Sequence, residues 1–154
     1  MSESVWKYPR PPRVEPAPRR IRIVLGGETI VDTRRAVRVL ETSHPPTYYV
    51  PKDELTGAEL VPSARSSVCE FKGRAIYWSI RAGGRTAQSA AWEYPDPAPG
   101  FEALRDRIAV YPDRMDACFV DDEQVVPQEG SFYGGWITSD VIGPFKGGPG
   151  TATW

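Results

Sequence analysis

Only two cysteines, Cys69 and Cys118, and one histidine, His44, occur in the 154 residues of this chain. A structural zinc site needs four cysteine or histidine ligands at close paired spacings, so we expect no metal site and no cofactor. A Ser–His–Asp triad would have to use His44, which precedes two prolines in a predicted turn, and no Gly-x-Ser-x-Gly elbow is present. No phosphate-binding loop and no dinucleotide fingerprint occurs either. The sequence therefore carries none of the common catalytic motifs.

Long apolar runs and an excess of one charge are also absent. No run of 18 apolar residues occurs, which argues against a membrane span, and residues 1–20 contain no apolar segment typical of a signal peptide. Because 19 Lys and Arg face 20 Asp and Glu, the charge balance argues against general binding of nucleic acid. Two cysteines in a chain without a signal peptide are typically reduced thiols rather than a disulfide, so we expect a cytoplasmic protein.

Proline and glycine, by contrast, are frequent, with 16 and 14 residues, and 40% of the chain is hydrophobic. This hydrophobic content is sufficient for the core of one domain. Five prolines between positions 9 and 18 block helix formation, so residues 1–20 are expected to form an extended basic arm. The arm either lies along the domain or a second subunit, or grips a phosphate-bearing partner, and a homodimer stays open. We expect a β domain over residues 21–145 and a loosely packed, Gly-rich tail over 146–154.

Short β-strands separated by turn signals fill the body of the chain. Gly26-Gly27 predicts a type I′ hairpin turn, which needs positive φ at both positions. Helical patterns are confined to residues 51–55 and 99–108. Strands spaced in this way predict a mostly β fold, a single compact antiparallel barrel or sandwich with one or two short helices. The expected strands are 21–25, 28–32, 36–40, 47–50, 67–72, 74–80, 85–94, 108–111, 117–120 and 124–126.

The segment 69–78 can be placed in register if Gly73-Arg74 are the two turn residues of a type II′ hairpin. Cys69 then lies opposite Trp78, and the two share a face because directly opposed residues do so. That face is apolar, so Cys69 is expected to be a small buried hydrophobe rather than a nucleophile. The other face is either a solvated sheet surface or the wall of a pocket. It carries Glu70, Lys72 and Tyr77.

A pocket wall is suggested because segments 41–51, 69–78 and 91–97 all combine aromatic and polar residues, the usual mixture in ligand pockets. Lys72 is expected to pair with a carboxylate or phosphate of a ligand, or with Glu41 when the site is empty. Alternatively, Glu41 satisfies backbone N–H groups in the double-proline turn that follows it. The candidate ligand-binding residues are Glu41, Tyr48, Glu70, Lys72, Tyr77 and Trp92.

These segments resemble the domain-of-unknown-function family 427, and the resemblance covers roughly residues 20–145. It implies a compact antiparallel domain related to the β-tent folds. It also implies a metal-free branch, because the paired cysteines of several β-tent relatives are missing. Phe132-Tyr-Gly-Gly-Trp-Ile-Thr resembles a longer-tailed branch of the family. The other matching pieces are Glu41-Thr-Ser-His-Pro-Pro-Thr-Tyr-Tyr, Cys69-Glu-Phe-Lys-Gly-Arg-Ala, Ala91-Trp-Glu-Tyr-Pro-Asp-Pro and Ile108-Ala-Val-Tyr-Pro.

That family is sometimes labelled nucleotidyltransferase-like. Such enzymes present a Gly-Ser step followed by two spaced acids that hold Mg²⁺. Here Gly130-Ser131 is followed by no acid pair, and the acids at 121–123 lie together in a predicted hairpin tip. Two functions stay open: a module that binds a small anionic molecule or a peptide, and an enzyme that uses Lys72 or Glu41 as acid, base or phosphate clamp. Turnover abolished by Lys72→Ala would indicate the enzyme.

Overall fold

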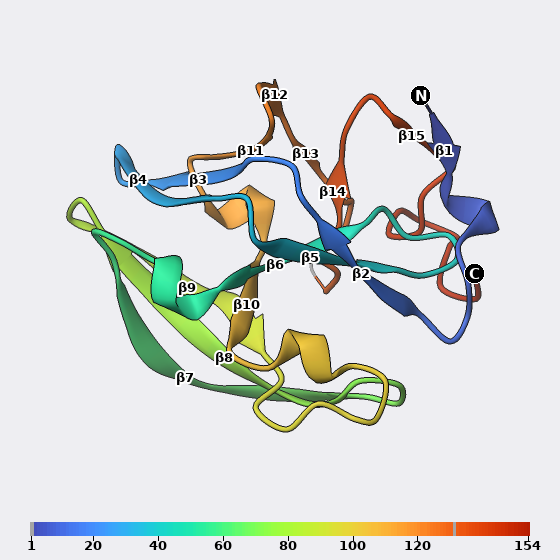
Figure 1. The fold of residues 1–154 in the computed structure, drawn as a ribbon, viewed down its shortest axis with the longest axis horizontal. Helices are drawn as coiled ribbons and strands as arrows, with labels where there is room; N and C mark the ends of the chain where they lie inside the picture. The colour runs from blue at the N-terminus through green and yellow to red at the C-terminus, as the bar shows by residue number, and fades with distance from the viewer. Residues whose placement is uncertain (1, 131) are drawn as a thin grey trace.

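The computed structural model of the chain describes residues 2–130 and 132–154. Met1, in the predicted arm, and Ser131, in the Gly130-Ser131 step, lie outside the described residues. Two antiparallel sheets stack on one another (Figure 1), and the predicted mostly β sandwich is confirmed. Over the described ranges, no helix is long and apolar enough to cross a membrane.

The larger sheet has seven strands in the order β2-β5-β6-β10-β9-β8-β7, and the smaller has four in the order β12-β11-β3-β4. The large-sheet strands are β2 (Arg13–Ala17), β5 (Ala36–Leu40), β6 (Thr47–Pro51), β7 (Glu59–Cys69), β8 (Gly73–Ala82), β9 (Arg85–Glu93) and β10 (Arg107–Val110). The small-sheet strands are β3 (Ile21–Leu25), β4 (Glu28–Thr33), β11 (Ala117–Val120) and β12 (Glu123–Gln124). Two short pairs complete the strands: β1 (Glu3–Ser4) with β15 (Val141–Ile142), which joins the two ends of the chain, and β13 (Val126–Pro127) with β14 (Trp136–Ile137).

The main core lies between the two sheets. Ile21, Ile23 and Leu25 on β3 are buried at every second position, as expected for a strand with one face on the core. They belong to the same apolar cluster as Val50 and Ile108 of the large sheet. A second cluster, rich in aromatic residues, covers the opposite face of the large sheet. The central strands of the large sheet are therefore buried on both faces.

The predicted Gly26-Gly27 turn connects β3 and β4, with φ angles of 61° and 77°. Gly83-Gly84 makes the equivalent turn between β8 and β9, with φ angles of 55° and 76°. These two turns touch, because a Cβ added to Gly83 would overlap the carbonyl oxygen of Gly26. Glycine is thus required here both for the positive φ angles and for the close approach of the two sheets.

The register predicted for the hairpin of residues 69–78 is wrong. Cys69 pairs with Gly73, so Glu70–Lys72 forms the connecting loop and Ser67, not Lys72, lies opposite Ala75. The loop is tied elsewhere, since Ala98 N–H donates to the Lys72 carbonyl at 2.9 Å. The shift is an odd number of residues, so the two faces are exchanged.

The exchange of faces also changes the predicted position of Cys69. It shares its face with Tyr77 rather than with Trp78, and it is half-buried against the aromatic cluster on the outer face of the large sheet. The expectation that Cys69 is a buried core residue is therefore wrong. Cys118, on β11, is buried in the main core.

Helical structure in the described residues is limited to four short 3₁₀ turns. The helix expected within residues 99–108 shrinks to one turn because Arg105 is already extended and Asp106 takes a positive φ of 61°. Ile108, which the helical pattern shared with the predicted strand 108–111, belongs to the strand β10. The turns are η1 (Val5–Lys7), η2 (Lys52–Glu54), η3 (Glu102–Leu104) and η4 (Pro112–Arg114).

Both ends of the chain pack on the same side of the domain (Figure 1). In the arm, β2 forms the edge of the large sheet beside β5, and Arg38 of β5 donates to both Glu3 and Glu15 at 2.7–2.9 Å. The tail is more closely packed than expected: Thr151 is buried, and the Trp154 ring lies 5.2 Å from that of Trp6. The two ends thereby help to enclose one face of the large sheet.

Candidate functional site

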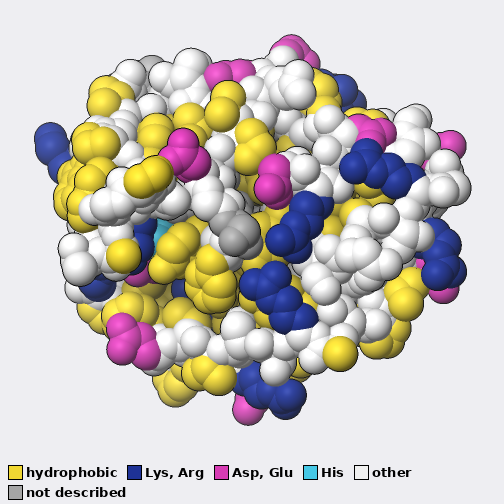
Figure 2. Space-filling model, turned by 180° about the vertical axis from the view of Figure 1, so that it is seen from behind, with side chains coloured by type: hydrophobic (Ala, Val, Ile, Leu, Met, Phe, Trp, Pro, Cys, Tyr) yellow, Lys and Arg dark blue, Asp and Glu magenta, His cyan; other side chains and the backbone are white. Residues whose placement is uncertain are grey.

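A cavity of about 400 Å³ lies on the outer face of the large sheet, beneath the tail. Pairing across the sheet explains its position. Val39 lies opposite Thr47, and Tyr77 lies opposite Trp92, so these four side chains share one face. Figure 2 shows this side of the molecule, with hydrophobic side chains in the hollow and the single histidine beside Lys or Arg side chains.

The floor of the cavity is aromatic, with Trp92 at its centre. The Trp92 ring centroid lies 4.6 Å from that of Tyr111, 6.2 Å from Tyr49 and 6.4 Å from Tyr77. Trp92 Nε1 donates a hydrogen bond to the Tyr49 hydroxyl at 3.2 Å. Burial raises the pKa of Tyr49 and of Tyr94, and it raises the pKa of Tyr111 to about 12. The floor is therefore aromatic and uncharged at neutral pH.

Charged side chains lie around this floor: the cations Arg10, Lys72 and Lys146, and the acids Glu41 and Glu70. Glu41 is paired, with its Oε2 3.5 Å from Arg10 Nε. Lys72 is only 9% exposed, and its Nζ lies 5.9 Å from the centroid of the Tyr94 ring. Among residues 2–130 and 132–154, no carboxylate oxygen lies within 4 Å of Lys72 Nζ. Lys72 thus forms no ion pair with Glu41.

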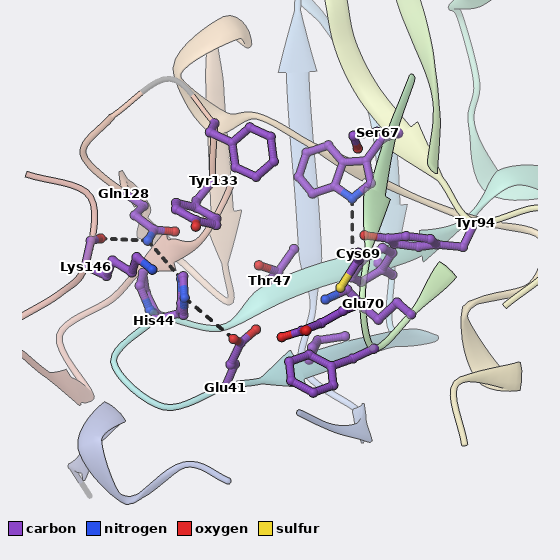
Figure 3. Close-up of a pocket in the computed structure, with 18 of the residues that line it drawn as sticks. Glu41, His44, Thr47, Ser67, Cys69, Glu70, Tyr94, Gln128, Tyr133 and Lys146 are labelled. Carbon is purple, nitrogen blue, oxygen red and sulfur yellow. Dashed lines mark hydrogen bonds and ion pairs between the residues drawn. The ribbon is translucent and has the colours of Figure 1, made fainter. Parts of the chain in front are cut away.

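His44 and Gln128 form the polar wall on the other side of the cavity (Figure 3). Gln128 accepts from the Gly135 N–H at 3.0 Å and donates to the Lys146 carbonyl at 2.7 Å and to His44 Nδ1 at 3.2 Å. Burial, followed by the positive charges of Lys146, Arg10 and Lys72, lowers the pKa of His44 to about 4. His44 is therefore neutral at pH 7.

The segment after β13 closes the cavity from above. Its Tyr133 ring packs edge-on against His44 at 4.7 Å, and Tyr111 donates a hydrogen bond to the Phe132 carbonyl at 3.0 Å. A Cβ added to Gly134 would overlap the Trp92 ring, so this segment lies directly on the aromatic floor. Glycine at this position lets the cover approach the floor closely.

Five of the six predicted site residues line the cavity: Glu41, Glu70, Lys72, Tyr77 and Trp92. Glu70 and Lys72 reach it from the loop between β7 and β8 rather than from a strand face. Tyr48 lies on the other face of the large sheet, where it packs 5.0 Å from Trp136 in the main core. Because successive residues of a strand point to opposite faces, Tyr49 takes the place predicted for Tyr48.

Several lining residues were not predicted. Tyr49 and Tyr94 could have been found from the alternation of side chains along a strand. Tyr49 lies two positions after Thr47, and Tyr94 lies two positions after Trp92, so each points to the same side as its cavity-lining neighbour. His44 was read only as a turn residue. Gln128 and Lys146 lie far along the chain, and no local pattern marks them as partners of His44.

The acids at 121–123 lie away from the cavity and have other partners. Asp121 pairs with Arg19 at 2.9 Å, and Glu123 accepts from the Ser139 N–H at 2.7 Å. Within the described part of the chain, no group of three or more His, Cys, Asp or Glu side chains is placed to hold a metal ion.

A family model described as a domain of unknown function, DUF427, matches residues 13–121. No curated protein matches the chain. The matched segment runs from β2 to the turn after β11, so it includes the aromatic floor, Lys72 and His44. It leaves out Gln128, Tyr133 and Lys146. Since the match covers well over half of the 154 residues, the chain belongs to the DUF427 family.

Proposed function

We propose that the cavity binds a small organic anion, with the acidic group at Lys72 and a planar body on the aromatic floor. The observation that supports this most strongly is the state of Lys72. The residue is 9% exposed, and no carboxylate of the described residues comes within 4 Å of its Nζ. An ammonium group that is partly desolvated and has no counter-ion is less favourable than a paired one. An anionic ligand would supply that counter-ion through a charge-assisted hydrogen bond.

The remaining lining favours a compact aromatic or otherwise planar body. A volume of about 400 Å³ falls within the usual range of roughly 300–1,000 Å³ for small-molecule sites. The cavity is lined by the aromatic residues Trp92, Tyr94 and Tyr111, which favour contact with an aromatic body. The terminal carboxylate of a short peptide offers the same acidic group, so a dipeptide is one of the ligands compared in the test.

Calorimetric titration tests the proposal with benzoate, with its neutral analogue benzyl alcohol, and with N-acetyl-alanyl-phenylalanine. We expect benzoate to bind saturably and benzyl alcohol to bind at least tenfold more weakly. Lys72→Met should weaken benzoate binding by about 10- to 100-fold, the equivalent of one hydrogen bond to a charged group. Tighter binding of the dipeptide than of benzoate would assign the cavity to peptide carboxylates.

Arg74→Met is the matched control, since Arg74 is an exposed cation on the same hairpin and does not line the cavity. Its benzoate affinity should equal that of the unsubstituted protein. Equal affinities for Lys72→Met and Arg74→Met would contradict the proposed role of Lys72.

A further inference from the structure

We infer that the cavity contains a second anion subsite, formed by His44 and Lys146 on the side opposite Lys72. The ligand would accordingly be an organic dianion with acidic groups at both ends of a planar body. This inference rests on the proposed function and specifies the class of ligand. It is argued from the hydrogen bonds of Gln128, the unpaired donor of His44 and the charges around that donor.

Gln128 fixes which nitrogen of His44 carries the proton. Its Oε1 accepts from the backbone N–H of Gly135, so its Nε2 is the atom that faces Lys146 and His44. An amide nitrogen only donates, and the Lys146 carbonyl can only accept, so the second N–H of Gln128 points at His44 Nδ1. Nδ1 must then be the acceptor. The neutral imidazole therefore carries its hydrogen on Nε2.

The Nε2–H of His44 has no acceptor of its own. The nearest carboxylate oxygen, Glu41 Oε2, lies 3.9 Å away, beyond hydrogen-bonding distance. Within residues 2–130 and 132–154, no other acceptor reaches Nε2, although His44 is 8% exposed and lines the cavity. The nitrogen is not sealed inside the protein but opens into the cavity, so its N–H is available to a molecule bound there. An acceptor atom of a bound ligand would satisfy this donor.

The charges around this donor favour an anionic acceptor. The Nζ of Lys146 lies 5.4 Å from the centroid of the Tyr133 ring, which itself packs on His44. The low pKa of His44, about 4, arises from burial and then from Lys146, Arg10 and Lys72, so three cations act on the imidazole. The one acid beside it, Glu41, is balanced by Arg10 at 3.5 Å.

The two subsites lie on opposite sides of the cavity. Figure 3 shows His44, Gln128, Tyr133 and Lys146 on one side and Tyr94 on the other. Lys72 belongs to the Tyr94 side, since its Nζ lies 5.9 Å from that ring. A ligand that reaches both cations would therefore lie across the cavity with an acidic group at each end.

Different parts of the chain supply the two subsites. Lys72 and the floor lie within the segment that matches the family, residues 13–121. Gln128, Tyr133 and Lys146 lie after it. The second subsite thus combines His44 of the matched segment with residues of the C-terminal segment, and it would determine which anions this chain prefers.

The test compares terephthalate, which has carboxylates at both ends of a ring, with benzoate, which has one. We expect terephthalate to bind at least tenfold more tightly than benzoate, the equivalent of one additional charge-assisted contact. Lys146→Met and, separately, His44→Phe should each reduce that preference to less than threefold, measured as the ratio of the two affinities in the same variant. Lys7→Met removes an exposed cation outside the cavity and should keep the full preference.

A readout at the residue itself accompanies the titration. The ¹⁵N chemical shift of His44 Nε2 should move when terephthalate is added and stay unchanged with benzoate. Equal affinities for the two acids, or a preference that survives in both variants, would overturn the second subsite. The proposed function would still stand if Lys72→Met abolished benzoate binding. Binding of neither acid would overturn both proposals.

Discussion

Lys72→Met should stabilise the protein while it removes ligand binding. The substitution keeps a side chain of similar length that can pack beside Tyr94, and it removes the ammonium group. In the folded chain Lys72 is 9% exposed as a whole residue, so most of its side chain is buried, and none of the described carboxylates pairs with its ammonium group. A buried charge without a partner costs free energy that an apolar side chain does not.

The expected gain follows from the extent of burial. The effective penalty for a buried ion is several kcal/mol, but Lys72 lines an open cavity and keeps part of its hydration. We therefore expect the free energy of unfolding to rise by about 1–2 kcal/mol. For a chain of 154 residues, each kcal/mol corresponds to a rise of about 2–4 °C in Tm.

Urea unfolding without ligand, followed by tryptophan fluorescence, measures this change, with Arg74→Met as the exposed control. The control should shift the free energy of unfolding by less than about 0.5 kcal/mol. A loss of more than about 1 kcal/mol in Lys72→Met would refute the reasoning, because it would show that the ammonium makes a stabilising contact within the folded chain.

Three further predictions concern the walls of the cavity. His44 has a native pKa of about 4 against 6.5 when unfolded, so only the unfolded chain gains its proton as pH falls from 6.5 to 4. Urea titrations should show a loss of up to about 3 kcal/mol over that range, and His44→Phe should lack this component. Cys69, half-buried in the cavity wall, should react with a thiol reagent well before Cys118, which is 2% exposed; mass spectrometry after brief labelling would show the reverse order if the fold were misread. Gly134→Ala should destabilise the protein by about 1–3 kcal/mol, because the added Cβ overlaps Trp92. An unchanged thermal unfolding curve would mean that the cover does not lie on the floor.

Local patterns were enough to predict most of the strands. The Gly26-Gly27 turn was predicted because two adjacent glycines meet its requirement for positive φ angles. Strands such as Ala36–Leu40 and Ala117–Val120 were predicted with the observed bounds. The register of the hairpin over residues 69–78 was predicted wrongly because its loop is held by the N–H of Ala98. This residue is distant in the sequence, so no rule based on local turn residues includes the contact. One odd shift in register then moved Cys69 to the other face.

The candidate site was predictable in composition but not in arrangement. Dense aromatic and polar segments indicated Lys72, Tyr77 and Trp92, all of which line the cavity. The choice of Tyr48 over Tyr49 required the strand register, which the sequence leaves open. Gln128 and Lys146 meet His44 only through tertiary packing of the tail, so no spacing in the chain could have predicted them.

The most direct test of the central claim is the position of a bound organic anion. Anomalous diffraction from crystals of the protein soaked in 4-iodobenzoate would locate the iodine without reference to the protein density. We predict one iodine site within the cavity over Trp92, with the carboxylate within hydrogen-bonding distance of Lys72 Nζ, and no such site in crystals of Lys72→Met. Iodine found only outside the cavity, or bound equally in Lys72→Met, would contradict the account.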